Sequence, residues 1–148
     1  MRKGISDEDH RSLALWAADC AEHVLPYFEK ERPKDDRPRK AIETGRDWAR
    51  SGMPMRMKVI RGASLAAHAA AREAEEDSAA RFAARAAGQA VAVVHVATHF
   101  TAVVDYAVKS AEAAGVAGER EWQLKHIPKG LRSLVKKMTE RKKKAKNR

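Results

Sequence analysis

The chain has 148 residues and a mass of 16.4 kDa, which allows one ordinary domain and excludes two separate cores. It contains 30 Lys and Arg against 20 Asp and Glu, so its formal net charge of +10 bears on its partners and not on its fold. Apolar residues make up 44% and aromatic residues only 5%, and 29 alanines favour closely packed helices over sheets. No apolar stretch is long enough for a membrane span, the charged N-terminus lacks a secretion signal, and Cys20 is the single cysteine. These features predict a cytoplasmic protein without a membrane segment.

The first predicted helix begins after Ser6, which forms a capping pair with Asp9. Its apolar residues recur at steps of three and four along one stripe, which comprises Leu13, Ala17, Cys20 and Val24. Pro26 is expected to end or kink this helix near Leu25.

A charged connection over residues 31–36 leads to a second predicted helix, which Asp35 or Asp36 can cap and which Gly52 ends. A third helix is predicted over residues 56–76, with Leu65, Ala66 and Ala69 on its inner face. The acidic residues after it place a boundary near Asp77 and Ser78.

The most regular pattern lies over residues 82–111, where apolar residues recur at alternating steps of four and three. It predicts one long helix or two collinear ones, at the centre of the fold. Two shorter helices follow, over residues 119–126 and 129–139, divided by Pro128. The predicted fold is therefore all-α, a single compact domain of five or six helices over residues 1–139 with a long central Ala/Val-rich helix. The alanine-rich faces allow two interpretations, a core or the seam of a homodimer.

The C-terminal tail is the most basic part of the chain. Residues 136–148 contain eight Lys or Arg and one Glu, and we expect residues 140–148 to be flexible and solvated. Such a tail predicts non-specific nucleic-acid binding as one possible function, although it has no aromatic residue to stack on bases. The cations concerned are Lys136, Lys137, Arg141, Lys142, Lys143, Lys144 and Lys146.

His95 and His99 are weak candidates for a metal site. On a helix their spacing would place both imidazoles on one face, but no third ligand accompanies them, and a purely structural role is the simpler interpretation. The sequence has no glycine-rich phosphate loop, no serine nucleophile elbow and no CxxC pair. We therefore expect no metal, no cofactor and no enzymatic activity.

A candidate partner-binding edge lies on the second predicted helix. It comprises Asp36, Arg37, Arg39, Arg46 and Trp48. Trp and Arg are frequent anchors of protein interfaces, which favours a binding edge. The same charges could instead form a network that pins the preceding loop to the helix.

Three segments carry a family resemblance: LALWAADCAEHVLPYFEKERPKDDRPRKAIETGRDWARSG, ASLAAHAAAREA and AARAAGQAVAVVHVATHFTAVVDYAVKSAEAA. Over about residues 13–114 the chain resembles the immunity-five-like domain family of putative bacterial immunity proteins. The most specific piece is DDRPRKAIETGRDWARSG. The resemblance implies a small cytoplasmic helical protein that protects its producer by binding a cognate polymorphic toxin. The Met-rich segment over residues 53–58 and the basic tail depart from the family pattern.

Overall fold

The computed structural model describes residues 5–147, and this range contains seven α-helices, one short 3₁₀ helix and no strand. The all-α prediction is confirmed, but the predicted number of five or six helices is wrong. The elements are α1 (Asp7–Glu31), α2 (Arg37–Ser51), α3 (Met57–Glu73), α4 (Ala79–Ala92), η1 (Ala97–His99), α5 (Phe100–Ala113), α6 (Glu119–Lys125) and α7 (Arg132–Lys146).

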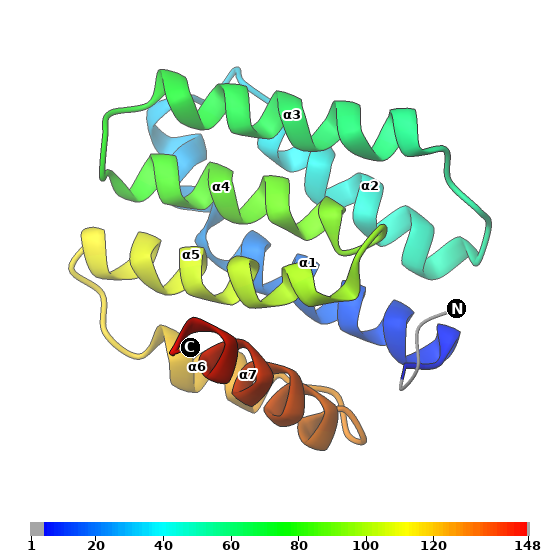
Figure 1. Cartoon of the computed structure of the whole chain (residues 1–148). Coiled ribbons are helices and arrows are strands. Elements are labelled where there is room, and N and C mark those ends of the chain that lie inside the picture. Colours follow the sequence, from blue (N-terminus) through cyan, green and yellow to red (C-terminus); the bar gives the residue numbers. More distant parts are fainter. Residues whose placement is uncertain (1–4, 148) are drawn as a thin grey trace.

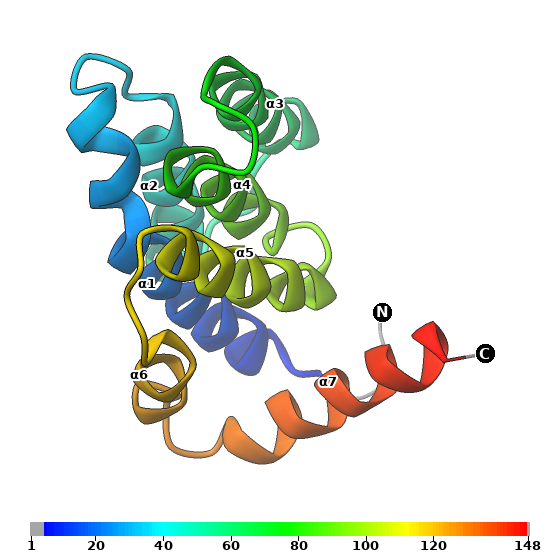
Figure 2. The same ribbon diagram turned by 90° about the vertical axis from the view of Figure 1, so that its left-hand side faces the viewer.

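The first five α-helices form two packed layers (Figures 1 and 2). Helices α3, α4 and α5 lie side by side in one layer, and α1 and α2 lie behind them in the other. Helix α4 is the centre of the fold because it packs against α1, α2, α3 and α5. The short helix α6 and the longer helix α7 lie below this body, beside α5 and α1.

Local sequence signals set the start of α1. The Ser6 hydroxyl accepts a hydrogen bond from the Asp9 backbone N–H at 3.1 Å, which confirms the predicted cap. Pro26 does not end the helix, which continues to Glu31. A proline removes one backbone hydrogen bond, and the buried side chains of Leu25 and Phe28 on both sides of Pro26 hold the helix in place.

The boundaries of α2 follow the predicted signals, whereas the inner face of α3 does not. An Asp35 carboxylate oxygen accepts from the Arg37 backbone N–H at 3.1 Å, and Gly52 ends α2 in the left-handed conformation with φ +70°. On α3, Leu65 was expected to face inward but is 60% exposed. The inner face consists instead of Ile60 and alanines.

The predicted long central helix is wrong, because α4 and α5 form an antiparallel hairpin (Figure 1). The helix breaks at residues 93–96, where three of four residues are β-branched valines that crowd an α-helical turn. Val96 is extended, with φ −135° and ψ 111°. The Nε2–H group of His10 donates to the freed carbonyl of Val93 at 2.6 Å, which satisfies the end of α4.

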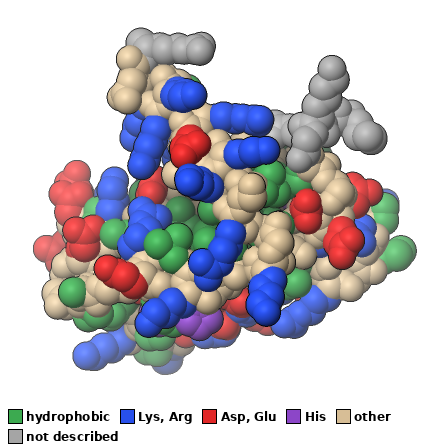
Figure 3. All heavy atoms as spheres, turned by 90° about the horizontal axis from the view of Figure 1, so that it is seen from below, with side chains coloured by type: hydrophobic (Ala, Val, Ile, Leu, Met, Phe, Trp, Pro, Cys, Tyr) green, Lys and Arg blue, Asp and Glu red, His purple; other side chains and the backbone are tan. Residues whose placement is uncertain are grey.

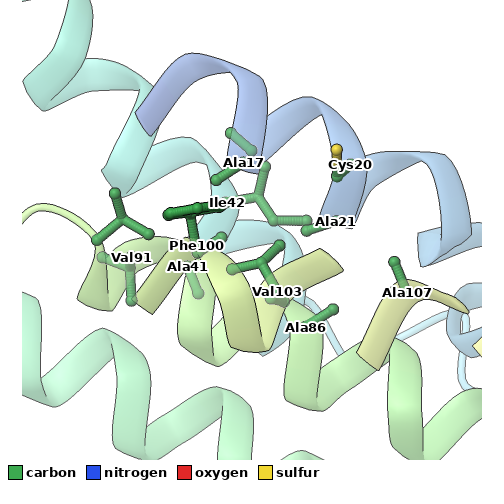
Figure 4. Packing of buried hydrophobic residues seen from close by; sticks show 14 of the residues in the cluster. Ala17, Cys20, Ala21, Ala41, Ile42, Ala86, Val91, Phe100, Val103 and Ala107 are labelled. Atoms are coloured by element: carbon green, nitrogen blue, oxygen red, sulfur yellow. The ribbon is translucent and has the colours of Figure 1, made fainter. Parts of the chain in front are cut away.

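Alanines fill the space between the helices in the core (Figure 4). Ala86 on α4 is fully buried, as are Ala17 on α1 and Ala107 on α5. Small side chains let helix backbones approach closely, and a few large ones, Phe100 among them, fill the remaining gaps. These alanine-rich faces are therefore core within one chain.

A histidine side chain lies directly over a glycine where α3 packs against α4. A Cβ atom on Gly88 would stand only 2.7 Å from His68 Nε2, so the imidazole requires a glycine beneath it. Arg85 donates to His68 Nδ1 at 2.8 Å. Burial lowers the pKa of His68 to about 4, so the ring is a neutral acceptor at pH 7.

The predicted flexible tail is wrong over the described residues, because α7 continues through residue 140 to Lys146. Lys and Arg are good helix formers, and cations near a helix C-terminus interact favourably with its dipole. Lys142 also donates to the Thr101 hydroxyl at 2.9 Å and so ties the helix to the body. Between residues 5 and 147, no helix combines the length and the apolar character that crossing a membrane requires.

Candidate functional site

Arg46 is the most buried of the predicted partner-binding arginines, with 13% of its side chain exposed. Its two terminal nitrogens donate to the two carboxylate oxygens of Glu22 on α1 at 2.9 and 2.8 Å. One of them also donates to Asp19 at 2.7 Å. This bidentate geometry fixes α2 against α1.

Arg39 makes a second bidentate pair along the same contact between α1 and α2. Its Nε and one terminal nitrogen each donate to Glu29 at 2.7 Å, and the other terminal nitrogen lies 3.6 Å from Glu22. The hydrogen bonds from Arg46 and Arg39 lower the pKa values of Glu22 and Glu29, respectively. Glu22 is therefore shared by both arginines.

Arg37 and Asp36 lie at the other end of α2. Arg37 donates to Asp35 at 2.7 Å and to Glu73 on α3 at 2.9 Å, so it connects α2 to the end of α3. The Asp35 carboxyl has a lowered pKa because Arg37 donates to it. Asp36 is mostly exposed, and its carboxylate lies 3.2 Å from the Lys40 ammonium group.

Trp48 packs near the start of α1, away from the other predicted residues. Its ring meets His10 edge to face with centroids 4.8 Å apart, and the Arg11 guanidinium carbon lies 5.8 Å from the Trp48 ring centroid. Arg11 also donates to the Gly52 carbonyl at 3.0 Å. Trp48 thus anchors the end of α2.

The structure brings Arg39 and Arg46 together around Glu22 and leaves Arg37, Asp36 and Trp48 outside that cluster. The sequence allowed a charge network that pins the loop to the helix, and the pair of Arg37 with Asp35 is of this kind. Arg39 and Arg46 pair instead with carboxylates of α1. A role for the same residues in partner binding stays a prediction.

We expect this network to make stability depend on acid pH. The folded-state pKa values of Glu22, Glu29 and Asp35 are lowered, so the stability that they contribute is present at neutral pH. It is lost as the pH falls below the ordinary carboxyl pKa values, which are 4.5 for the two glutamates and 3.8 for Asp35. In urea unfolding at a series of pH values, Arg46→Met should be less stable than the wild type at pH 7, and the difference should shrink toward about pH 3.

Arg50→Met provides the matched control, because Arg50 is exposed on the same helix. Its free energy of unfolding should equal that of the wild type at every pH. A difference between Arg46→Met and the wild type that is independent of pH would contradict the ionic role of Arg46.

A second polar cluster, which the sequence does not reveal, joins α6 to α1. Glu119 is buried, and both of its carboxylate oxygens accept from His23 Nδ1, at 2.8 and 2.9 Å. The His23 and His126 rings both stack on Trp122, with ring centroids 3.6 Å and 4.1 Å from that of Trp122, respectively. Asp19, four residues before His23 on α1, pairs with Arg46 instead.

Cys20 lies close to this cluster. Burial raises the pKa of its thiol well above the ordinary range, and the negative charge of Glu119 raises it further. The thiol is therefore protonated at neutral pH and is a poor nucleophile.

The helical spacing assumed for His95 and His99 is wrong, because both residues lie in the connection between α4 and α5. His95 is exposed, and His99 Nδ1 donates to the Gln89 side-chain oxygen at 3.0 Å. Within residues 5–147, no group of three or more His, Cys, Asp or Glu side chains is placed to hold a metal ion.

Helix α7 carries the predicted nucleic-acid-binding cations. Seen from below, Lys and Arg side chains gather over this region of the surface (Figure 3). Lys142 is half-buried, 3.6 Å from Asp105. The other predicted cations are exposed and form no ion pair with any described residue: Lys136, Lys137, Arg141, Lys143, Lys144 and Lys146.

The fold and the site define a class of small all-helical protein. Its helices pack antiparallel, and ion pairs join neighbouring helices at the surface. Within this class, the chain belongs to the family described as Imm-5 like putative immunity protein, whose model matches residues 3–130. No curated protein and no protein of solved structure matches the chain significantly. The resemblance noted in the sequence is confirmed, and α7 begins just beyond the matched residues.

Proposed function

We propose that this protein is an immunity protein that neutralises a cognate bacterial toxin by binding it directly, without catalysis of its own. The observation that carries the proposal is the family match over residues 3–130, which spans helices α1 to α6. Such a role requires a preorganised surface and no reactive group. The bidentate pairs of Arg39 and Arg46 support it, because side chains already held in place lose little entropy on binding.

We place the toxin-binding face on α2, around Asp36, Arg37, Arg39, Arg46 and Trp48. The exposed carboxylate of Asp36 and the partly exposed guanidinium groups of Arg37 and Arg39 give this face both signs of charge. The body is less basic than α7, so this face suits a toxin surface that is neutral or mixed in charge. A homodimer and a cytoplasmic location stay predictions.

Affinity capture tests the proposed function. The tagged chain is incubated with nuclease-treated lysate of its source organism, and bound proteins are identified by mass spectrometry. The captured protein is then expressed alone and together with this chain. Growth arrest by the captured protein alone, with rescue on co-expression of the full chain, is the expected result. Absence of any toxic partner would contradict the proposal.

Alanine substitutions test the position of the face. Asp36→Ala and Arg37→Ala should each weaken the affinity for the captured toxin by about 10-fold or more, as anchors of an interface do. Arg72→Ala, an exposed change on α3, should leave the affinity unchanged. Isothermal titration calorimetry measures Kd for all three. Unchanged affinities would remove this face while leaving toxin binding itself intact.

The alternative function, non-specific association with nucleic acid through α7, also stays a prediction. The exposed and unpaired cations of α7 are compatible with it. The experiment described below separates it from a protein-binding role.

A further inference from the structure

Helix α7 is attached to the body along a narrow stripe. Leu131 and Val135 are buried, whereas Leu134 and Met138 are only partly buried. Farther along, Lys142 is its polar tie to α5. Figure 2 shows the helix extending away from the two layers toward its C-terminal end.

A groove of about 810 Å³ lies along one edge of α7. The opposite wall is formed by the start of α1 and by the segment that leads into α5. Its apolar lining comes from Ile5, Ala97, Leu134 and Met138. The groove is therefore large enough, and apolar enough, to hold side chains of a partner.

Cations line the α7 side of this groove. Lys137 and Arg141 are one helical turn apart on the same edge of α7, and Lys142 adds a third charge. Asp9 lies on the opposite wall and is the acidic residue of the lining. Neither Lys137 nor Arg141 pairs with a carboxylate in the described part of the chain, so the groove has unneutralised positive charge beside an apolar floor.

We infer that this groove binds an acidic amphipathic segment of a partner protein. The apolar floor matches aliphatic side chains on one face of such a segment, and Lys137 and Arg141 match carboxylates on its edge. A nucleic acid fits less well. Its charged phosphates do not pack against aliphatic side chains, and the groove lining has no aromatic ring on which bases could stack. No lining residue belongs to α2, so this interaction is separate from the proposed toxin-binding face.

The test uses the full chain and a fluorescein-labelled synthetic peptide of 15 residues, with Glu on one helical face and Leu on the other. Binding is measured by fluorescence anisotropy. The variant Lys137→Glu/Arg141→Glu should weaken binding by about 10-fold or more, because it reverses the charge beside the groove. The matched control is Arg132→Glu/Lys136→Glu. It changes the net charge equally and also lies one turn apart on α7, but neither residue lines the groove. It should change Kd by less than about 2-fold.

Two further probes separate the alternatives. A peptide with Leu replaced by Ser should bind much more weakly if the apolar floor takes part. A 15-nucleotide single strand that binds as well as the peptide and loses affinity equally in both double variants would overturn the inference in favour of general polyanion binding. Circular dichroism checks that α7 stays helical, and Lys137→Gln/Arg141→Gln replaces the charge-reversed variant if it does not. Failure of wild-type protein to bind the Glu/Leu peptide would also overturn the inference.

Discussion

Replacing Phe100 with alanine is expected to lower the free energy of unfolding by about 3–5 kcal/mol. Phe100 is the first residue of α5 and is fully buried, with its ring centroid 6.0 Å from that of Trp16. Alanines on the surrounding helices cannot change rotamer to fill the space that the ring leaves (Figure 4). A domain of this size is stable by about 5–15 kcal/mol, so the loss is a large fraction of the total. Urea unfolding followed by circular dichroism measures it.

Phe82→Ala is the matched control for this experiment. Phe82 lies on α4 and is half-buried beside Tyr106, with ring centroids 6.3 Å apart. Water can reach the space that its ring leaves, so we expect a loss of about 1 kcal/mol. Equal losses for the two phenylalanines would contradict the central position of Phe100 in the core.

Most helix boundaries could be predicted because their signals are local. Ser6 and Ser78 cap their helices through their own hydroxyl groups, and Gly52 ends α2 with a positive φ. The break between α4 and α5 has no glycine or proline to mark it. It depends on the valines of residues 93–96 and on a hydrogen bond from His10, which is 83 positions away in the sequence. Periodicity alone therefore joined two antiparallel helices into one.

At the C-terminus the sequence predicted too little helix rather than too much. Its composition was interpreted as a solvated tail, although Lys and Arg are good helix formers and an apolar stripe over Leu131, Leu134 and Met138 precedes it. Lys142 extends the helix beyond that stripe by reaching Thr101 and Asp105 on α5. A contact between residues 41 positions apart cannot be read from charge pattern.

The sequence predicted which residues belong to the candidate site, but not which carboxylates the arginines pair with. Arg39 and Arg46 were identified as candidates for a charge network, yet their partners Glu29 and Glu22 lie on the preceding helix, 10 and 24 positions away. The partner of His23 is still more remote, since Glu119 lies 96 positions away. Nothing in the neighbourhood of Glu119 distinguishes a buried carboxylate from the exposed Glu121.

Replacing His23 with leucine is expected to cost about 2–3 kcal/mol, because it leaves the buried Glu119 carboxylate without its hydrogen-bond partner. The cost is below that of a fully buried pair because 38% of the His23 side chain is exposed. Helix α6 has only seven residues and depends on such contacts to stay folded. Thermal and urea unfolding, together with amide exchange at α6, measure the effect.

His126→Leu is the control, since both imidazoles stack on Trp122 but only His23 contacts Glu119. It should cost no more than about 1 kcal/mol. The double variant His23→Leu/Glu119→Leu tests whether the unpartnered carboxylate causes the loss of stability. If the loss in His23→Leu comes from an unpartnered carboxylate, removing that carboxylate should restore stability, because an apolar pair can replace a buried ionic one at little cost. A double variant less stable than His23→Leu would show instead that the ring stacking and packing of His23 hold α6 in place.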